Sequence, residues 1–259
     1  MEVPMEIKGK KAIVFGGASG MGRATAELLA ARGAEVAVLD RPQSAGAEVA
    51  AGFGGSFHAV NVTDFAGTES VIAQAVDQLG GLHVTVTTAG GGIAKRTLGK
   101  EGPHDLESFQ AVLNLNTVAT FNISRLAAAH MARNEAEDED TPERGVIVNT
   151  ASIAAFEGQI GQVAYTAAKA AIAGMCLTMA RDLGSFGIRV LAIAPSLFST
   201  GATVNVPEEM SKALVKDAAF PKRMGRPEEY AKLALAIVDN PMLNGQCLRL
   251  DAGQRFAPR

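Results

Sequence analysis

Cysteine is scarce in this chain: only Cys176 and Cys247 occur among its 259 residues. Two cysteines cannot build the disulfide framework of a small secreted protein, and their separation excludes a CxxC motif for metal binding or redox exchange. We therefore expect a reducing compartment and a cytoplasmic protein. The histidines are also scattered, which predicts no metal site; they are His58, His83, His104 and His130.

A strong excess of charge and a long apolar run are missing as well. The formal net charge is -3, which gives no electrostatic footprint for nucleic acid or an anionic membrane. The apolar stretches around 190–194 and 233–238 fall well short of the ~20 residues that span a bilayer, and no run near the N-terminus suits a signal peptide. We therefore expect neither nucleic acid nor a membrane as a partner.

The sequence does contain enough apolar side chain for a packed core, with 47% apolar and 20% charged residues. Short β-branched runs, which predict strands, occur at 11–15, 35–39, 56–60, 83–87, 145–149, 188–193 and 247–250. Helical patterns separate them, at about 21–32, 43–52, 64–79, 106–133, 163–186 and 227–238. Such alternation, with no linker to divide it, predicts an α/β protein: one doubly wound Rossmann domain over residues 1–259, with about seven parallel strands and helices on both faces.

Three segments fall outside these regular units. Residues 93–105 are rich in glycine and basic side chains, and residues 134–144 are acidic, which favours a solvated surface loop because like charges repel. The third segment, at about 196–226, is long for a connection in a compact domain. We predict that it is a lid over a substrate.

Glycines at Gly16, Gly20 and Gly22 lie between the first predicted strand and the first predicted helix. Glycine lets the backbone turn sharply and approach a pyrophosphate, and a helix N-terminus offers free N–H groups to it, although such glycines can also simply make a turn. Asp40 ends the second strand, where a carboxylate accepts hydrogen bonds from the adenosine ribose of a dinucleotide. The alternative is that Asp40 caps the next helix.

The same carboxylate indicates which dinucleotide is bound. Asp40 would repel a 2′-phosphate, and Ser19 rather than a basic residue stands within the glycine turn. Arg41 argues the other way, because a guanidinium there could pair with that phosphate. We predict NAD as the cofactor.

Tyr165 and Lys169 are four residues apart and so share one helix face, although a surface pair of this kind is also common. Ser152 lies just beyond the end of the 145–149 strand, and Asn116 lies in the long helix before it. Ligand sites in open α/β sheets lie at these strand ends. These four residues are the candidate catalytic groups.

Together these motifs resemble the short-chain dehydrogenase/reductase family over essentially the whole chain: the glycine turn, TAGGG after the fourth strand, Asn116, Ser152, YTAAK and residues 195–200 occur in order. The resemblance implies that Tyr165 is the general acid/base and that Lys169 lowers its pKa and binds the nicotinamide ribose. It also implies that Ser152 orients the substrate oxygen and that Asn116 holds a water in a proton relay. The implied NAD-binding residues are Gly16, Ser19, Gly20, Met21, Gly22, Asp40, Asn61, Val62, Ala89, Gly90, Tyr165, Lys169, Pro195, Leu197 and Thr200. The implied substrate-binding residues are Ser152, Gln162, Tyr165, Leu197 and Phe198.

Four residues depart from the family pattern without removing a catalytic group: Phe15, Asn61, Thr88 and Ser196. Phe15 and Thr88 end neighbouring strands, so we predict that an apolar contact replaces a polar one between them. Asn61 still offers an amide oxygen to the adenine amine. The departures concern cofactor affinity more than chemistry.

Longer stretches, at 109–135, 144–175 and 240–253, resemble one subgroup of this family, the type II 3-hydroxyacyl-CoA dehydrogenases, also described as type 10 17β-hydroxysteroid dehydrogenases. The resemblance implies a role in fatty acid metabolism: oxidation of a 3-hydroxyacyl-CoA to the 3-ketoacyl-CoA with NAD, with 2-methyl branching left open. Cations at Lys95, Arg96 and Lys100 could meet CoA phosphates, or could simply form a solvated loop.

Alternative functions remain open on the sequence. The chain could oxidise steroids or other secondary alcohols, or act as a 3-oxoacyl carrier-protein reductase, which would usually use NADPH and a more basic docking surface. A non-catalytic NAD-binding scaffold is a third possibility, against which Ser152, Tyr165 and Lys169 count. Small residues on the 106–133 and 163–186 helices permit close helix packing and resemble the family's interfaces, so we expect a homotetramer that acts on a small molecule.

Overall fold

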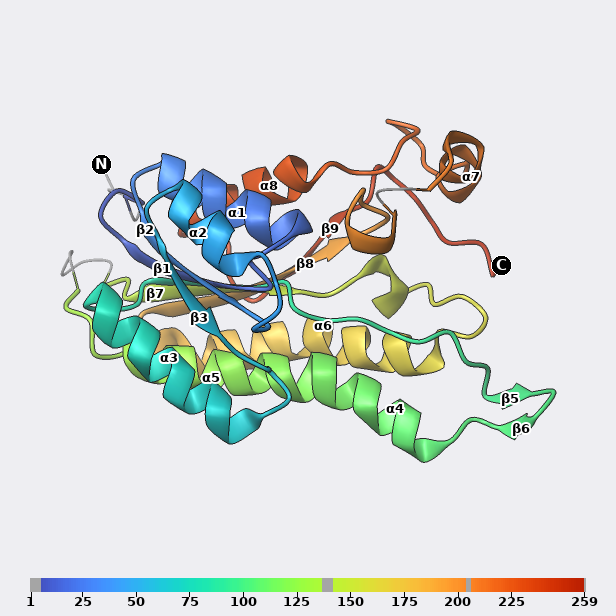
Figure 1. Cartoon of the computed structure of the whole chain (residues 1–259), viewed down its shortest axis with the longest axis horizontal. Coiled ribbons are helices and arrows are strands. Elements are labelled where there is room, and N and C mark those ends of the chain that lie inside the picture. Colours follow the sequence, from blue (N-terminus) through green and yellow to red (C-terminus); the bar gives the residue numbers. More distant parts are fainter. Residues whose placement is uncertain (1–5, 137–141, 204–205, 259) are drawn as a thin grey trace.

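The computed structural model describes residues 6–136, 142–203 and 206–258 and contains a seven-stranded parallel sheet (Figure 1). The strands lie in the order β3-β2-β1-β4-β7-β8-β9. Their bounds are β1 (Lys11–Phe15), β2 (Glu35–Asp40), β3 (Ser56–Ala59), β4 (Val84–Thr87), β7 (Gly145–Thr150), β8 (Ile188–Pro195) and β9 (Cys247–Leu250). The α/β prediction with about seven parallel strands is confirmed.

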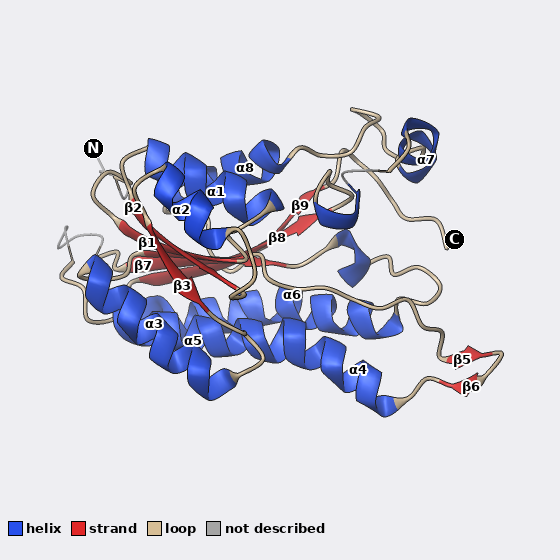
Figure 2. Cartoon of the chain, in the orientation of Figure 1, coloured by secondary structure: helices blue, strands red, loops and turns tan. Residues whose placement is uncertain are grey.

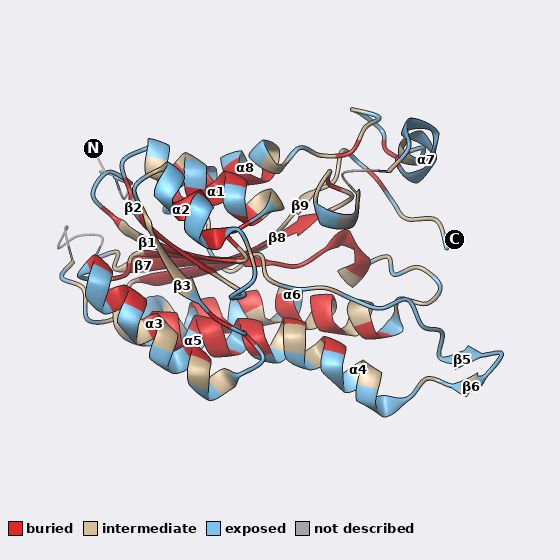
Figure 3. Cartoon of the chain, viewed as in Figure 1, coloured by how far each residue is buried: buried red, intermediate tan, exposed pale blue. Residues whose placement is uncertain are grey.

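Helices cover both faces of the sheet (Figure 2). One layer consists of α1 (Gly20–Ala31), α2 (Gly46–Gly52) and α8 (Pro227–Asp239). The opposite layer consists of α3 (Phe65–Leu79), α4 (Leu106–Leu113), α5 (Ala119–Met131) and α6 (Val163–Leu183). Because both faces are covered, buried residues concentrate in the sheet and on the inner helix faces (Figure 3).

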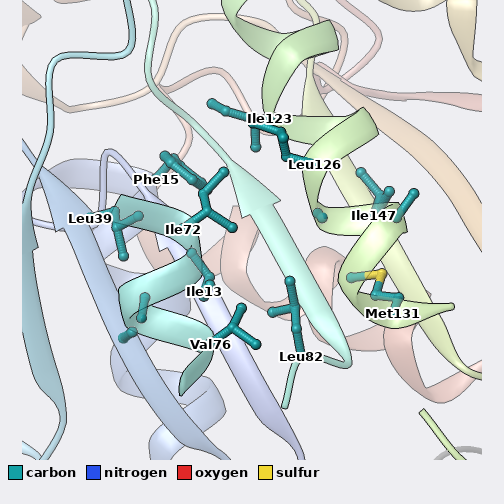
Figure 4. Close-up of a cluster of buried hydrophobic side chains, with 14 of the residues drawn as sticks. Ile13, Phe15, Leu39, Ile72, Val76, Leu82, Ile123, Leu126, Met131 and Ile147 are labelled. Carbon is teal, nitrogen blue, oxygen red and sulfur yellow. The ribbon is translucent and has the colours of Figure 1, made fainter. Parts of the chain in front are cut away.

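Alternate strand residues supply the two halves of the core. On β1, Ala12 and Val14 pack toward α1 and α8, whereas Ile13 and Phe15 pack toward α3 and α5. This two-residue period is what a pleated strand imposes. Figure 4 shows the second cluster, in which Ile72 of α3 and other apolar side chains surround those of β1.

The predicted helix at 106–133 is interrupted in the structure. A π-helical stretch, η1 (Asn114–Val118), separates α4 from α5 and contains Asn116. Single π-helical turns inside α-helices occur frequently at functional sites. The helix predicted at 43–52 is also shorter, because α2 begins only at Gly46.

Two of the three irregular segments contain short elements that the sequence patterns did not predict. Residues 93–105 include a two-stranded antiparallel hairpin, β5 (Leu98–Gly99) and β6 (Gly102–Pro103). The predicted lid includes η4 (Gly201–Thr203) and α7 (Glu208–Leu214). The remaining short helices are η2 (Ile153–Ala155) and η3 (Gly184–Phe186). Most of the predicted acidic surface loop, 137–141, lies outside the described residues.

One helix of the described chain is long and apolar enough to cross a membrane by length and composition alone, at Val163–Phe186. Buried core helices pass the same test. In this fold α6 packs along β8, and its buried side chains include Ala168, Ile172 and Cys176. One face of α6 therefore packs in the core of this fold, and 39% of the apolar window is buried.

Candidate active site

A pocket of about 560 Å³ lies where the carboxyl ends of the parallel strands meet. Its lining comes from the segments that follow β1, β2, β3, β4, β7 and β8, together with α6. The chain reverses its strand order between β1 and β4, and open α/β sheets bind ligands at such a point. The predicted site residues that line the pocket are Gly16, Ser19, Gly20, Met21, Asp40, Asn61, Val62, Ala89, Gly90, Ser152, Tyr165, Lys169, Pro195, Leu197, Phe198 and Thr200.

The glycine turn fits a pyrophosphate. Gly16 and Gly20 have φ angles of 75° and 52°, a conformation that favours glycine. A Cβ atom at Gly22 would lie 2.2 Å from the carbonyl oxygen of Gly16, so only glycine lets the first turn of α1 pack so closely on the loop. Gly22 therefore shapes the turn from behind the pocket. The N-terminus of α1 follows directly, with N–H groups suited to an anion.

Asp40 braces the same turn at the end of β2. Its Oδ2 atom accepts a hydrogen bond from the Ala18 N–H (3.0 Å), and its Oδ1 atom accepts one from the Arg41 N–H (2.7 Å). The alternative that Asp40 caps the next helix is wrong, because α2 begins at Gly46 with Ala45 as its N-cap residue. Asp40 instead lines the pocket next to the glycine turn, where a dinucleotide would bind.

The predicted apolar contact between Phe15 and Thr88 is also wrong. The Thr88 hydroxyl donates a hydrogen bond to the main-chain carbonyl of Phe15 at 2.9 Å, so the contact stays polar. The Phe15 side chain points away into the core cluster of α3 and α5 (Figure 4). At Asn61, the amide oxygen already accepts hydrogen bonds from the N–H and hydroxyl of Thr63, so an adenine amine would have to share it.

Ser152, Tyr165 and Lys169 converge in the pocket from two elements. Ser152 is the second residue after β7 and the N-cap of η2, and its Oγ accepts a hydrogen bond from the Ala154 N–H (3.1 Å). Tyr165 and Lys169 project from the first two turns of α6. The Ser152 side chain lies close enough to Tyr165 to affect the pKa of the phenol, and both residues line the pocket. A hydroxyl donor and a phenol therefore face the same space, as acid/base chemistry on one substrate oxygen requires.

Burial shifts the pKa values of both Tyr165 and Lys169. It raises the pKa of Tyr165, and the Ser152 side chain opposes that shift. Burial also lowers the pKa of Lys169, to about 8, with its ammonium 5.7 Å from the centre of the Tyr165 ring. The chain's own groups thus leave Tyr165 protonated, and a phenolate needs a further positive charge in the pocket.

Sequence reasoning missed Thr150, which bonds to the lysine, and Tyr230, which contacts Thr150. Lys169 Nζ donates a hydrogen bond to the carbonyl oxygen of Thr150 (2.8 Å). The Thr150 hydroxyl donates to the carbonyl of Thr87 (2.5 Å) and lies 2.7 Å from the hydroxyl of Tyr230, which is fully buried on α8. The position of Thr150 at the end of β7 could have singled it out. Nothing in the local pattern of α8 indicates the role of Tyr230.

Asn116 and Gln162 do not line the pocket. The Asn116 amide donates to the carbonyls of Gly91 (2.7 Å) and Val112 (2.8 Å) and accepts from the Gly91 N–H (3.2 Å), which fixes the loop that carries Gly90. The Gln162 side chain instead accepts a hydrogen bond from the N–H of Gln159 (3.0 Å). Both residues hold loops that border the site.

Comparison with known proteins gives one family. A family model described as short chain dehydrogenase matches residues 10–211. The chain is 48% identical to the 3-hydroxyacyl-CoA dehydrogenase type-2 of Drosophila melanogaster and 45% identical to that of Homo sapiens, over 97% of this chain and 100% and 97% of those proteins. It is 31% identical to a 3-oxoacyl-[acyl-carrier-protein] reductase of Thermotoga maritima, over 96% of this chain and 99% of that protein. A crystal structure of 3-hydroxyacyl-CoA dehydrogenase type-2 from Mycobacterium avium superposes with a TM-score of 0.92 at 40% identity, covering 98% of this chain and 100% of that one.

Proposed function

The chain belongs to the short-chain dehydrogenase family, and from that premise we propose that it oxidises the 3-hydroxyl group of a 3-hydroxyacyl-CoA to the 3-ketoacyl-CoA with NAD. The observation that carries the proposal is the meeting of Ser152, Tyr165 and Lys169 beside the glycine turn in one pocket. Several relatives at 43–48% identity over nearly the full chain have names that state this activity.

The residues of the chain account for the proton in this reaction. Tyr165, as phenolate, takes the proton of the substrate hydroxyl, and Ser152 donates a hydrogen bond to the same oxygen. Lys169 adds positive charge that favours the phenolate. Bound NAD supplies the acceptor for the hydride that leaves the carbinol carbon, and its positively charged ring adds the further charge that the buried tyrosine needs. The products are the ketone, NADH and one proton.

We predict that NAD binds at least about tenfold more tightly than NADP. Asp40 lies in the pocket lining. Repulsion between its carboxylate and a 2′-phosphate would cost several kcal/mol even when partly screened. Arg41, in the same lining, would reduce this repulsion. Direct titration of both cofactors measures the ratio. Asp40→Asn removes the charge at nearly constant shape and should lower the ratio of NAD affinity to NADP affinity. Equal affinities in the unmodified protein would contradict the assignment.

The CoA phosphates would meet the basic segment at 93–105. Lys95 forms an ion pair with Asp105, so its charge is already balanced. Arg96 and Lys100 are exposed, and no ion pair links either of them to another part of the described chain. We propose that Arg96 and Lys100, rather than Lys95, contact the phosphates.

Initial rates of NADH formation test the substrate class. We expect faster turnover with 3-hydroxyacyl-CoA thioesters than with a steroid alcohol or simple secondary alcohols. Preference for a steroid or a simple alcohol would instead support the alternative alcohol dehydrogenase. Binding of NAD without turnover of any of these compounds would support a scaffold.

We propose a homotetramer as the working assembly. A groove of about 290 Å³ lies between α5 and α6 and is lined by small and apolar side chains that include Ala128, Ala129 and Met179. Phe121 in this lining remains 47% exposed. Light scattering at micromolar concentration should give four chains, and Phe121→Asp should give a smaller species because a charge would be buried. A monomer of the unmodified chain would contradict the proposal.

A further inference from the structure

The last described residues, 251–258, lie between two segments that are continuous along the chain with the pocket lining. This C-terminal tail follows β9 and runs between α7 and the chain that enters α6 (Figure 1). On one side it contacts residues 206–226, the outer lid, which contains α7. On the other side it contacts the segment that joins η2 to α6, which we call the 156–162 loop.

Gln254 is the main contact with the outer lid. Its side chain is 2% exposed, and Nε2 donates a hydrogen bond to the carbonyl oxygen of Leu214 (2.9 Å), the last residue of α7. The terminal carbonyls of a helix otherwise lack partners, so this bond secures the end of α7. The carbonyl of Ala252 accepts two more bonds, from the N–H groups of Ala219 (2.9 Å) and Phe220 (3.2 Å).

The backbone of the tail is bent to make these contacts. Ala252 has a φ angle of 53°, a left-handed conformation that residues other than glycine rarely adopt. Such a conformation persists only where its surroundings hold it. The surroundings here include Gly253, which packs against Ala219 so closely that a Cβ atom would lie 2.9 Å from the Ala219 side chain.

The other side of the tail is bonded to the 156–162 loop. Three hydrogen bonds join them: Ile160 N–H to Pro258 O (3.0 Å), Gln159 Nε2 to Ala257 O (3.1 Å) and Phe256 N–H to Glu157 Oε2 (3.1 Å). The tail therefore supplies hydrogen-bond partners to three residues of the loop, Glu157, Gln159 and Ile160.

A network of ion pairs strengthens this second contact. Glu157 pairs with Arg249 (2.7 Å) and Arg255 (3.3 Å), and Asp251 pairs with the same two arginines at 2.6 and 3.1 Å. The Arg249 guanidinium also lies 5.4 Å from the centre of the Phe156 ring. The Glu157 and Asp251 side chains are only 20% and 10% exposed, so salt screens this network less than a surface pair.

We propose that the C-terminal tail is a strap that couples the outer lid to the 156–162 loop, with Gln254 and Glu157 as positioning residues. The loop joins the segment of Ser152 to the helix of Tyr165, so its conformation sets how these two side chains meet a substrate. The outer lid continues the chain from Leu197 and Phe198 in the pocket lining. The effect on substrate rests on the proposed function, whereas the coupling itself does not.

Hydrogen–deuterium exchange of the full chain tests the coupling without any substrate. Gln254→Ala removes the bond to α7 and should speed exchange about tenfold in the outer lid and also in the 156–162 loop. Glu157→Gln removes a negative charge from the 156–162 loop, at the other contact of the tail, with little change in side-chain volume. It should speed exchange in the loop and also in the outer lid. Coupling between two sites is reciprocal, so both variants must affect both segments. Faster exchange confined to the segment that each variant touches would overturn the proposal.

Glu208→Gln is the matched control, because it breaks an exposed ion pair with Lys212 within α7 and leaves the Gln254–Leu214 bond in place. It should leave exchange in the 156–162 loop unchanged. In the assay with 3-hydroxyacyl-CoA, Glu157→Gln should raise KM several-fold while the affinity for NAD stays the same. If the unmodified protein turns over no thioester, the proposed function fails, and the exchange experiment still decides the coupling.

Discussion

Replacing Tyr165 by phenylalanine is expected to lower turnover by roughly 10²–10⁴-fold, the usual contribution of a general acid/base. The change removes only the phenolic hydroxyl, and the ring keeps its place beside Ser152 in the pocket. NAD affinity should therefore change little. Steady-state rates and a direct NAD titration, made on the same preparation, separate the two effects.

The second tyrosine of the chain provides a matched control. Tyr230→Phe removes the same atom from a fully buried side chain whose hydroxyl lies beside that of Thr150. Loss of one buried hydrogen bond should lower the free energy of unfolding by about 1 kcal/mol, with a much smaller effect on turnover than Tyr165→Phe. Near-normal turnover in Tyr165→Phe would refute the assignment and favour the NAD-binding scaffold.

Lys169→Ala is expected to reduce both turnover and NAD affinity, which distinguishes it from Tyr165→Phe. The ammonium of Lys169 is buried and bonded to the carbonyl of Thr150, so its position in the pocket is fixed. Its loss removes a positive charge that lies 5.7 Å from the centre of the Tyr165 ring and leaves the Thr150 carbonyl without this donor. We expect turnover to fall at least about 10²-fold.

Calorimetric titration with NAD measures the second effect of this change. NAD affinity should fall about tenfold or more, because the resemblance to the family implies that the same ammonium binds the nicotinamide ribose. A Lys169→Ala protein that binds NAD as tightly as the unmodified chain would contradict this dual role. Loss of affinity without loss of turnover at saturating NAD would contradict its role in catalysis.

The sequence predicted the sheet well because its signals are local. The seven strand positions follow from β-branched runs between turn residues, and β1 (Lys11–Phe15) has the predicted bounds. The glycine turn was equally clear from its spacing, although a Cβ atom at Gly22 would meet both the nearby Gly16 carbonyl and the distant Thr88 hydroxyl. Asp40 was harder, because its choice between a helix cap and the pocket depended on where α2 begins.

The missed features depend on partners that are distant in the sequence. The π-helical turn at Asn116 follows a periodic apolar pattern like any helix, and the Asn116 side chain bonds to the backbone of Gly91, which is 25 residues away. Thr150 and Tyr230 are 80 residues apart. Gln162 remains a predicted substrate contact, and its side chain bonds to the N–H of Gln159. The spacing of residues along the chain does not determine which hydrogen-bond partner a side chain has in the folded structure.

The most direct test of the central claim follows a deuterium atom from C3 of a 3-hydroxyacyl-CoA. The unmodified protein should transfer that deuterium to NAD, so that mass spectrometry finds it in NADH, while Tyr165→Phe should transfer it at least about 10²-fold more slowly. Absence of deuterium from NADH with the labelled thioester, in a preparation that binds NAD, would contradict the account.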